Sequence, residues 1–336
     1  MTTQSSKKPI KLSVIIVSYN TAKLTLATLD SLVTDLQTSS LLATSEIFIV
    51  DNNSKDDSLA QIKNWQAKKA SKHFPNLTLH IIENKDNRGF AYANNAGIEQ
   101  AKGEYIFLLN SDTIVHPGAC AQMISIFEQN PSNEATAHLS SYSSKTDKIG
   151  MVSAQLVNTD GSLQSQGGDL PSFASILPHF LFIDDIPFFG QFLPSTQHTQ
   201  TQTTGLSQIG WVAATAVMVS RALIKEIGPL DQHIFMYGED IEWCIRAKKH
   251  HWDVVINHDA KITHIGSASS HSSRAIIGEM RAYEYIWAKH KPLWQRPLLQ
   301  ASIKVACVLR IVLFGTILRQ ANRAQPYKEL LTSSTL

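Results

Sequence analysis

Apolar residues in the first third of the chain gather in four short runs. The runs are LSVIIV (12–17), IFIV (47–50), LTLHII (77–82) and YIFLL (105–109). Each is rich in β-branched residues and too short for a buried helix, which predicts strands covered on both faces. Between the first two runs, Leu26, Leu29 and Val33 recur at helical spacing. Strands that alternate with helices predict an α/β fold with a doubly wound, mostly parallel sheet.

Polar residues follow each of these four predicted strands. The turns read SYN (18–20), DNNS (51–54), ENKDNRG (83–89) and NSD (110–112). In open α/β sheets, ligands bind outside the carboxyl ends of the strands. A binding site is therefore expected among these four turns.

The second half of the chain has a less regular pattern. Residues 131–148 are polar and rich in Ser and Thr, which indicates a surface insertion. Residues 169–208 mix Pro and Phe with a Gln/Thr-rich tract and suggest a mobile loop. Regular structure is expected again from residue 210 onwards. The pattern predicts a strand over 210–221, a helix over 238–252 and strands over 253–256 and 261–265.

The C-terminal segment from Arg296 to Arg319 predicts a basic amphipathic helix. On a helical wheel, Arg296, Gln300, Lys304 and Arg310 fall within an arc of roughly 120°, opposite Leu, Val and Ala. The charges interrupt the apolar run, and a spanning helix needs about 20 apolar residues. A helix of this kind favours lying in a membrane interface. The alternative is a helix packed on the main domain.

The composition narrows the classes of function. Lys and Arg total 30 and Asp and Glu total 28, so the chain lacks the basic excess typical of nucleic-acid binding. The three cysteines are widely spaced without a C-x-x-C pair, which excludes a disulfide framework and indicates buried or incidental thiols. The polar N-terminus and the short apolar run after it do not fit a signal peptide, so we expect a cytosolic protein.

Two acidic residues at predicted strand ends are candidates for a nucleotide site. Asp51 could accept a hydrogen bond from a pyrimidine N3–H or a ribose hydroxyl, although an N-cap or turn Asp fits the same position. A dinucleotide site would also place an acid there, but the turn SYNTAK after the first strand lacks G-x-G-x-x-G. Asp112 could bind a hard divalent cation that bridges to a diphosphate, or could serve only as a turn residue.

Further candidates lie in the second half. Glu239, Asp240 and Glu242 form the densest acidic cluster in the chain. One of them could be a general base, or all three could simply favour the positive end of a helix dipole. His264 follows a predicted strand and could ligate a metal or donate to a phosphate, although any one of thirteen histidines can be incidental.

Six segments, taken in order, resemble one enzyme family. They are SVIIVSYN (13–20), IVDNNSKDDS (49–58), NRGFAYANNAGI (87–98), GEYIFLLNSD (103–112), GEDIEWCIRAKKHHW (238–252) and HIGSAS (264–269). The set is similar to the inverting family-two glycosyltransferases, and most similar to the branch with bacterial rhamnosyltransferases of surface-polysaccharide assembly. NTDGSLQSQGGDLPSF (158–173) also resembles that branch. The resemblance covers about residues 11–270.

The resemblance implies a GT-A fold and a role for each matching residue. Asp51 would bind the base near Tyr19, Asn20 and Asn53, and Arg88 and Asn95 would line the sugar-nucleotide site. Asp112 would end a D-x-D-like motif and hold Mg²⁺ or Mn²⁺ on the diphosphate, with His264 completing that site. Asp240 would be the catalytic base. Glu239 would orient the acceptor, and we expect Trp211 to contact the acceptor too.

The sequence departs from the family pattern at two of these motifs. The triplet Asn110-Ser111-Asp112 has one carboxylate fewer than Asp-x-Asp, and His251 stands where the family usually has Gly. The insertion at 131–148 has no assigned role.

We therefore expect a polar tail (1–10), a GT-A domain (11–290) and a membrane-associating segment (291–336). Within the domain, the nucleotide-binding half would span about 11–115 and the acceptor half about 150–290. The expected partners are a nucleoside-diphosphate sugar, a glycan or lipid-linked acceptor and the cytoplasmic face of the cell membrane, without nucleic acid. A nicotinamide-dependent oxidoreductase and a non-catalytic membrane-associated scaffold are the alternatives.

Overall fold

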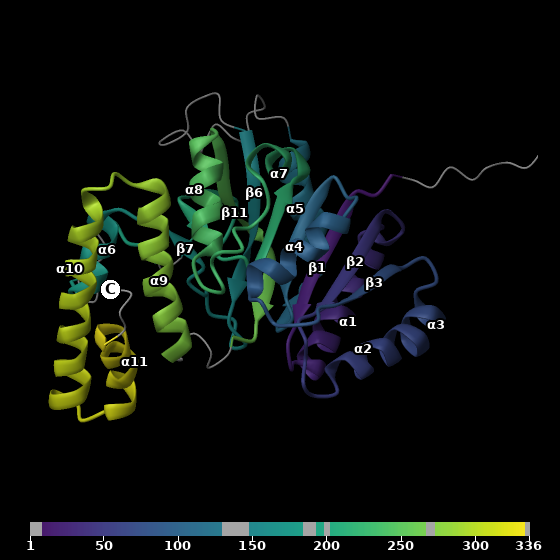
Figure 1. The fold of residues 1–336 in the computed structure, drawn as a ribbon. Helices are drawn as coiled ribbons and strands as arrows, with labels where there is room; N and C mark the ends of the chain where they lie inside the picture. The colour runs from purple at the N-terminus through teal and green to yellow at the C-terminus, as the bar shows by residue number, and fades with distance from the viewer. Residues whose placement is uncertain (1–8, 130–147, 184–192, 198–201, 267–272, 333–336) are drawn as a thin grey trace, which may run out of the picture.

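The computed structural model describes residues 9–129, 148–183, 193–197, 202–266 and 273–332 (Figure 1). Within these ranges the chain forms one nine-stranded sheet, a small two-stranded sheet, and helices on both faces of the large sheet. Apart from Lys148, the insertion predicted at 131–148 lies outside the described residues.

The first half of the sheet is parallel and contains all four predicted strands. They are β1 (Leu12–Ser18), β2 (Ser45–Asp51), β3 (Thr78–Glu83) and β4 (Tyr105–Asn110). Their order is β3-β2-β1-β4, and each neighbouring pair runs parallel. Every residue of β2 is buried, as expected for a strand covered by helices on both faces.

The second half of the sheet differs from the prediction, because it is mixed. The order continues β10-β6-β11-β5, with β8 also paired to β11. The strand β10 lies antiparallel to both β4 and β6, so "mostly parallel" holds only for the first half. These strands are β5 (Thr113–Val115), β6 (Lys148–Val157), β8 (Leu206–Ile209), β10 (Ala216–Ser220) and β11 (Trp252–His264).

Two predicted elements of this half have different boundaries. The strand expected over 210–221 is divided between β9 (Trp211–Val212), which pairs with β7 (Gly167–Gly168), and β10. The two strands expected over 253–256 and 261–265 are one long strand, β11, with a register shift between Asn257 and Lys261. A bulge of this kind bends a strand without ending it, so the pattern looks interrupted while the strand continues.

Helices cover the sheet in two layers, each with its own hydrophobic cluster. One layer consists of α1 (Ala22–Thr38), α2 (Ser58–Trp65) and α5 (Ala119–Glu128). The other consists of α4 (Phe90–Gln100), α6 (Phe173–Phe180), α7 (Arg221–Ile227), α8 (Glu239–Lys249), α9 (Ser273–His290), α10 (Gln295–Arg310) and α11 (Ala321–Thr332). Short helical turns span Leu42–Thr44, Gln66–Ala70, Ser71–His73 (α3) and Ile311–Ile317. All three cysteines are buried in these layers.

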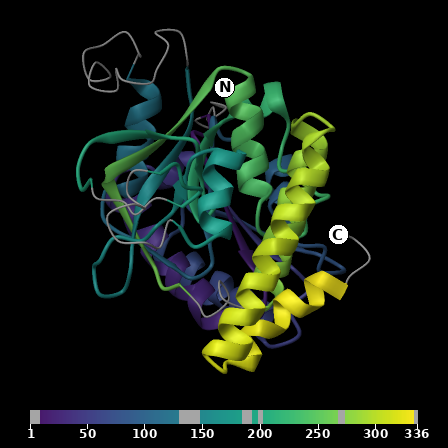
Figure 2. The ribbon, with the colours of Figure 1, turned by 90° about the vertical axis from the view of Figure 1, so that its left-hand side faces the viewer.

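The helix α10 lies at the edge of the molecule farthest from β3, with α11 folded back against it (Figures 1 and 2). Its inner side, including Leu299 and Ile303, belongs to the main core cluster. The helical wheel placed Arg310 among the exposed charges, and this is wrong. Arg310 is buried and donates hydrogen bonds to the carbonyls of His179 and Phe180, because it faces α6.

Glu242, the third member of the acidic cluster, is held by side chains of two helices. It is buried and pairs with Arg246 (2.8 Å) on its own helix and with Lys289 (2.8 Å) and His290 (2.9 Å) on α9. Hydrogen bonds from His290 and Lys289, together with the charge of Arg246, lower the pKa of Glu242 against the opposing effect of its burial. The network ties α8 to α9.

We expect Glu242→Gln to lower the free energy of unfolding by about 3 kcal/mol, since removing one partner of a buried ion pair leaves the other charges uncompensated. Urea denaturation at pH 7 measures this loss. The difference from wild type should shrink below about pH 4.5, where Glu242 of the unfolded chain is protonated. A loss below 0.5 kcal/mol, as typical of surface substitutions, would contradict the structural role.

Candidate active site

The carboxyl end of β2 carries a buried acid, Asp51. Asp51 is only 3% exposed. One oxygen, Oδ2, accepts a hydrogen bond from the backbone N–H of Ser54 (3.1 Å). The other, Oδ1, has no hydrogen-bond partner among the described residues. Since an unpaired buried carboxylate oxygen is costly, this atom is suited to accept a hydrogen bond from a ligand.

The turns after β1 and β2 are tied together beside Asp51. The Asn20 side chain accepts a hydrogen bond from the N–H of Lys55 (2.7 Å), and the Asn20 N–H donates to the hydroxyl of Ser54 (3.0 Å). Asn20 and Asn53 both have left-handed backbone conformations, with φ of 55° and 65°, which Asn adopts more readily than most residues. Tyr19 lies exposed on the same turn. These three predicted residues therefore lie in the two turns that flank Asp51.

A network of asparagines, which the sequence reasoning missed, continues the site to Arg88. Asn52 donates to the side chain of Asn87 (2.9 Å) and accepts from that of Asn84 (3.0 Å). Arg88 is exposed, and its guanidinium lies 4.2 Å from the centre of the Tyr92 ring. The repeated Asn in the turns after β2 and β3 was the available signal for this network.

Two other predicted site residues have buried side chains. Asn95 is buried in α4, and its amide makes hydrogen bonds to both the N–H (3.1 Å) and the carbonyl (2.7 Å) of Leu230. Trp211 is buried, and its indole N–H donates to the carbonyl of Thr196 (2.8 Å). Both side chains therefore hold neighbouring loops in place with their polar groups.

The turn after β4 and the end of β11 bring Asp112 and His264 together. Asp112 Oδ1 lies 3.4 Å from His264 Nε2. The other ring nitrogen, Nδ1, lies 2.8 Å from the amide oxygen of Gln164, while Gln164 donates its amide N–H to Asn158. An amide oxygen only accepts hydrogen bonds, so in the neutral imidazole the proton is on Nδ1 and a lone pair on Nε2 faces Asp112.

This pair fits a divalent cation. A carboxylate oxygen and an imidazole lone pair that face each other repel unless a proton or a cation lies between them. The Gln164 oxygen accepts the Nδ1 proton of His264 and so holds the ring with Nε2 toward Asp112. The described residues contain no group of three or more His, Cys, Asp or Glu side chains that could hold one metal ion. Two side-chain ligands leave room for substrate phosphates, as is common for Mg²⁺.

The acidic pair at the start of α8 lies close to this turn. Asp240 accepts hydrogen bonds from the N–H groups of Ala214 (3.3 Å) and Ile241 (2.8 Å). The next residue after Ala214, Thr215, accepts a hydrogen bond from the N–H of Asn110 (2.8 Å), two residues before Asp112. Short backbone links therefore connect the candidate base to the candidate metal ligand.

Burial sets the protonation of this pair. Desolvation raises the pKa of Asp240 to about 6, despite its backbone hydrogen bonds. Desolvation, together with the charge of Asp240, raises the pKa of Glu239 to about 8. Near neutral pH, Asp240 is thus ionised and Glu239 holds a proton. A carboxylate with a pKa of about 6 is well matched to general base catalysis near pH 7.

The helix α9, beyond the segment that resembles the family, forms a wall behind this pair. A Cβ atom on Gly238 would lie 2.5 Å from the Cβ of Ala282, so the backbone before Glu239 packs directly on α9. One turn away, Glu279 accepts a hydrogen bond from the hydroxyl of Tyr283 (3.3 Å), and its charge adds to the rise in the pKa of Asp240. Sequence reasoning missed Glu279, because no motif surrounds it.

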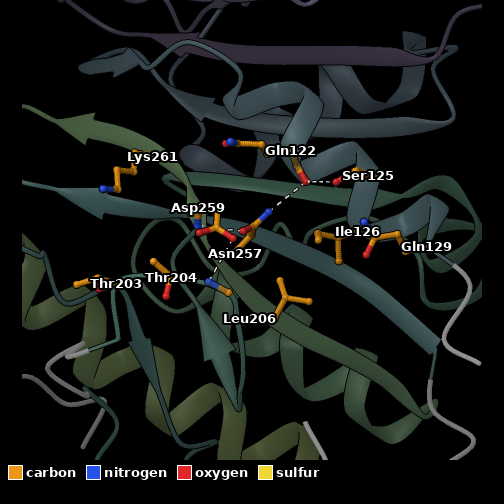
Figure 3. A pocket seen from close by; sticks show the side chains of 11 residues that line it. Gln122, Ser125, Ile126, Gln129, Thr203, Thr204, Leu206, Asn257, Asp259 and Lys261 are labelled. Carbon is orange, nitrogen blue, oxygen red and sulfur yellow. Dashed lines mark hydrogen bonds between the residues drawn. The ribbon is translucent and has the colours of Figure 1, made fainter. Parts of the chain in front are cut away.

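A separate cavity of about 610 Å³ lies between α5 and the middle of β11 (Figure 3). Its lining includes Gln122, Asn257 and Asp259, and Asn257 donates a hydrogen bond to the carbonyl of Gln122 (3.1 Å). None of the predicted site residues lines this cavity.

The sheet with its parallel half, and the helices on both of its faces, have the arrangement of a GT-A fold. The chain belongs to glycosyl transferase family 2, whose family model matches residues 13–183. The acidic pair and His264 lie beyond the matched residues.

Curated relatives are hexosyltransferases and glycan synthases. The chain is 22% identical over 244 residues to the low-salt glycan biosynthesis hexosyltransferase Agl10 of Haloferax volcanii, which covers 71% of this chain and 62% of that protein. It is 23% identical over 159 residues to the N-acetylglucosaminyl-diphospho-decaprenol L-rhamnosyltransferase of Mycobacterium tuberculosis, covering 46% of this chain and 51% of the relative. The chain thus matches about half to three fifths of the length of these relatives.

Solved structures share the fold at low sequence identity. GalNAc-T7 with UDP, GalNAc and Mn²⁺ superimposes with a TM-score of 0.55 at 16% identity, covering 88% of this chain and 52% of that one. The mannosyltransferase PcManGT from Pyrobaculum calidifontis, in complex with GDP-Man and Mn²⁺, gives a TM-score of 0.50 at 16% identity, with 97% and 86% covered. These likenesses confirm the predicted GT-A fold.

We expect Glu239→Gln to stabilise the folded protein increasingly as the pH rises. The pKa of Glu239 is raised by folding from 4.5 to about 8, so folding takes up a proton between these values, and stability falls as the pH increases through that window. Gln removes this dependence. The Tm difference between the variant and wild type should be near zero at pH 4.5, grow up to pH 8 and then level off.

Glu99→Gln, on the exposed side of α4, is the matched control and should give a flat difference. A flat difference for Glu239→Gln as well would contradict the protonated state assigned to Glu239.

Proposed function

We propose that the protein is an inverting glycosyltransferase that transfers a sugar, with rhamnose as the candidate, from a nucleoside-diphosphate sugar to a hydroxyl of a lipid-linked glycan. The observation that carries the proposal is the acidic pair of buried Glu239 and half-buried Asp240, linked by backbone hydrogen bonds to the turn that bears Asp112. Family membership and the names of the relatives support this reaction class. The product would serve cell-surface polysaccharide synthesis.

In the proposed donor site, Asp51 recognises the base. Its unpaired Oδ1 would accept the N3–H of uracil or thymine, while Ser54 continues to hold Oδ2. Tyr19, Asn20 and Asn53 would border the nucleoside, and Arg88 would approach the phosphates as an exposed cation. The hydrogen bonds of Asn95 give it a supporting role at this site.

In the proposed reaction, Asp240 takes the proton of the acceptor hydroxyl as the oxygen attacks the anomeric carbon. The bond to the diphosphate breaks on the opposite face, so the anomeric configuration inverts. Glu239, which holds a proton near neutral pH, would donate a hydrogen bond to the acceptor and orient it. A Mg²⁺ or Mn²⁺ ion held by Asp112 and His264 would supply the positive charge that stabilises the leaving diphosphate.

The two alternatives explain less of the site. A nicotinamide-dependent oxidoreductase would need a glycine-rich phosphate loop after β1, where the chain reads SYNTAK. A non-catalytic scaffold would leave the buried, unpaired oxygens of Asp51 and Glu239 without a purpose. Release of nucleoside diphosphate on mixing donor and acceptor distinguishes the transferase from both alternatives.

We also propose that the protein works at the cytoplasmic face of a membrane, held there by α10. The stretch Gln295–Ile317 is long and apolar enough to cross a membrane by length and composition, but its inner side packs on the core. The outward side exposes Leu298, Val305 and Leu309, with Val305 50% exposed. The chain has no Asp or Glu between Tyr285 and Lys328, so this edge suits anionic lipid headgroups.

Asp240→Asn should lower kcat by at least about 100-fold while leaving donor affinity unchanged. Asn keeps the size and a hydrogen-bond acceptor but cannot take the proton, and a positioned base contributes roughly 10² to 10⁴-fold. Nucleotide release measures kcat, and calorimetry with thymidine diphosphate measures donor affinity. Glu239→Gln is the companion variant and should mainly raise the KM for the acceptor. Nearly full kcat in Asp240→Asn would reject Asp240 as the base.

The double substitution Val305→Glu and Leu309→Glu should move the protein from the membrane to the soluble fraction. Both side chains are exposed, so the charges oppose lipid contact without entering the core. Asn322→Glu adds a charge to an exposed position of α11, outside this apolar stripe, and serves as the control. Flotation with vesicles containing phosphatidylglycerol measures binding. Equal flotation of the double variant and wild type would rule out this surface.

A further inference from the structure

A large aromatic side chain stands exposed just before the acidic pair. Phe235 is 57% exposed, whereas its neighbour Ile234 is only 5% exposed and anchors the loop to the interior. Phe235 lies in the segment between α7 and α8, four residues before Glu239. None of the roles assigned above uses this side chain.

The loop that carries Phe235 is held firmly at its beginning. Leu230 is fixed by two hydrogen bonds with Asn95, donating its N–H and accepting at its carbonyl. Asp231 accepts hydrogen bonds from the hydroxyl of Tyr285 (2.8 Å) and from Lys289 (2.5 Å), both on α9. An exposed side chain on a mobile loop can fold away from water. These contacts fix the start of the loop and so restrict that movement of Phe235.

The loop is also fixed at Phe235 itself. The carbonyl of Phe235 accepts a hydrogen bond from the N–H of Phe90 (2.8 Å) at the start of α4. The same carbonyl oxygen lies so close to Gly89 (φ 97°) that a Cβ atom on Gly89 would be 2.1 Å from it. Only glycine fits both the contact and the left-handed conformation. Phe235 therefore lies between the turn that carries Arg88, on the donor side, and the acidic pair.

We propose that Phe235 is the stacking surface for the acceptor sugar, on the side of the cleft that carries the base. This inference rests on the proposed transfer reaction. The acceptor hydroxyl must reach Asp240, and Phe235 belongs to the same short segment as Asp240, so a sugar ring at Phe235 can present a hydroxyl to that carboxylate. The C–H face of a pyranose ring is apolar and flat. When this face packs on the Phe235 ring, both apolar surfaces are removed from water.

The donor is a poorer occupant for this surface. Phe235 meets the donor-side turn through its backbone carbonyl, at Phe90, whereas its side chain is exposed four residues before the acidic pair. A lipid chain would also bury an apolar side chain, but it needs no flat ring. The shape of the side chain at position 235, flat or branched, therefore distinguishes a sugar ring from a lipid chain.

The test uses the full-length protein, thymidine diphosphate rhamnose as the donor, and a short-chain polyprenyl N-acetylglucosaminyl diphosphate as the acceptor. Phe235→Ala should weaken acceptor binding, measured by calorimetry, and raise the acceptor KM, each about tenfold. The affinity for thymidine diphosphate should stay within about twofold of wild type. Phe235→Trp should keep tight acceptor binding, and Phe235→Leu should bind as weakly as the Ala variant.

The control is His233→Ala, an exposed ring on the same loop, which should leave acceptor binding unchanged. Unchanged acceptor binding in Phe235→Ala overturns the stacking role, and so does full recovery by Leu, which would indicate the lipid chain. Weaker donor binding in Phe235→Ala would assign the side chain to the donor. If wild type binds the acceptor but releases no nucleotide, the transfer reaction fails while the binding comparison still decides the role of Phe235. Absence of acceptor binding by wild type overturns the stacking inference.

Discussion

The active site depends on the antiparallel pairing of β10 with β4. This ladder joins the parallel half of the sheet, which carries Asp51 and Asp112, to the second half, which carries the acidic pair. At its end, the hydrogen bond from the Asn110 N–H to the Thr215 carbonyl aligns two turns that lie about a hundred residues apart in the chain. Without this pairing, the groups proposed to bind the donor and the acceptor would have no fixed separation, which the proposed in-line displacement requires.

The acidic pair is held where ionised carboxylates are unfavourable. Glu239 is buried and Asp240 half-buried, and both lose water that would otherwise stabilise their charges. The folded protein gives up stability to keep a proton on one carboxyl and remove it from the other. Glu242, two residues further along the helix, shows the contrasting case, since Arg246 and Lys289 compensate its charge and His290 donates a hydrogen bond to it.

Much of the first half of the fold could be predicted from the sequence, because short β-branched runs have one favourable burial pattern. The direction of β10 could not, since alternation or burial along a strand says nothing about its orientation in the sheet. The burial of Asn95, Trp211 and Arg310 arises from contacts with Leu230, Thr196 and α6, which no local pattern contains. His251, noted as a departure from the usual Gly, has φ of 59°, so the family's glycine matches a left-handed turn that this chain forms at some conformational strain.

The buried cysteines have a practical consequence for the chemistry of the folded chain. Burial raises the pKa of Cys244 to about 12 and that of Cys307 to about 11, and it raises the pKa of Cys120 well above its ordinary value. Alkylating reagents attack the thiolate, so the native state is inert to them at neutral pH. Cys120 lies under one layer of helices and Cys244 and Cys307 under the other. The rate at which each thiol becomes labelled therefore reports separately on the opening of the two sides of the sheet.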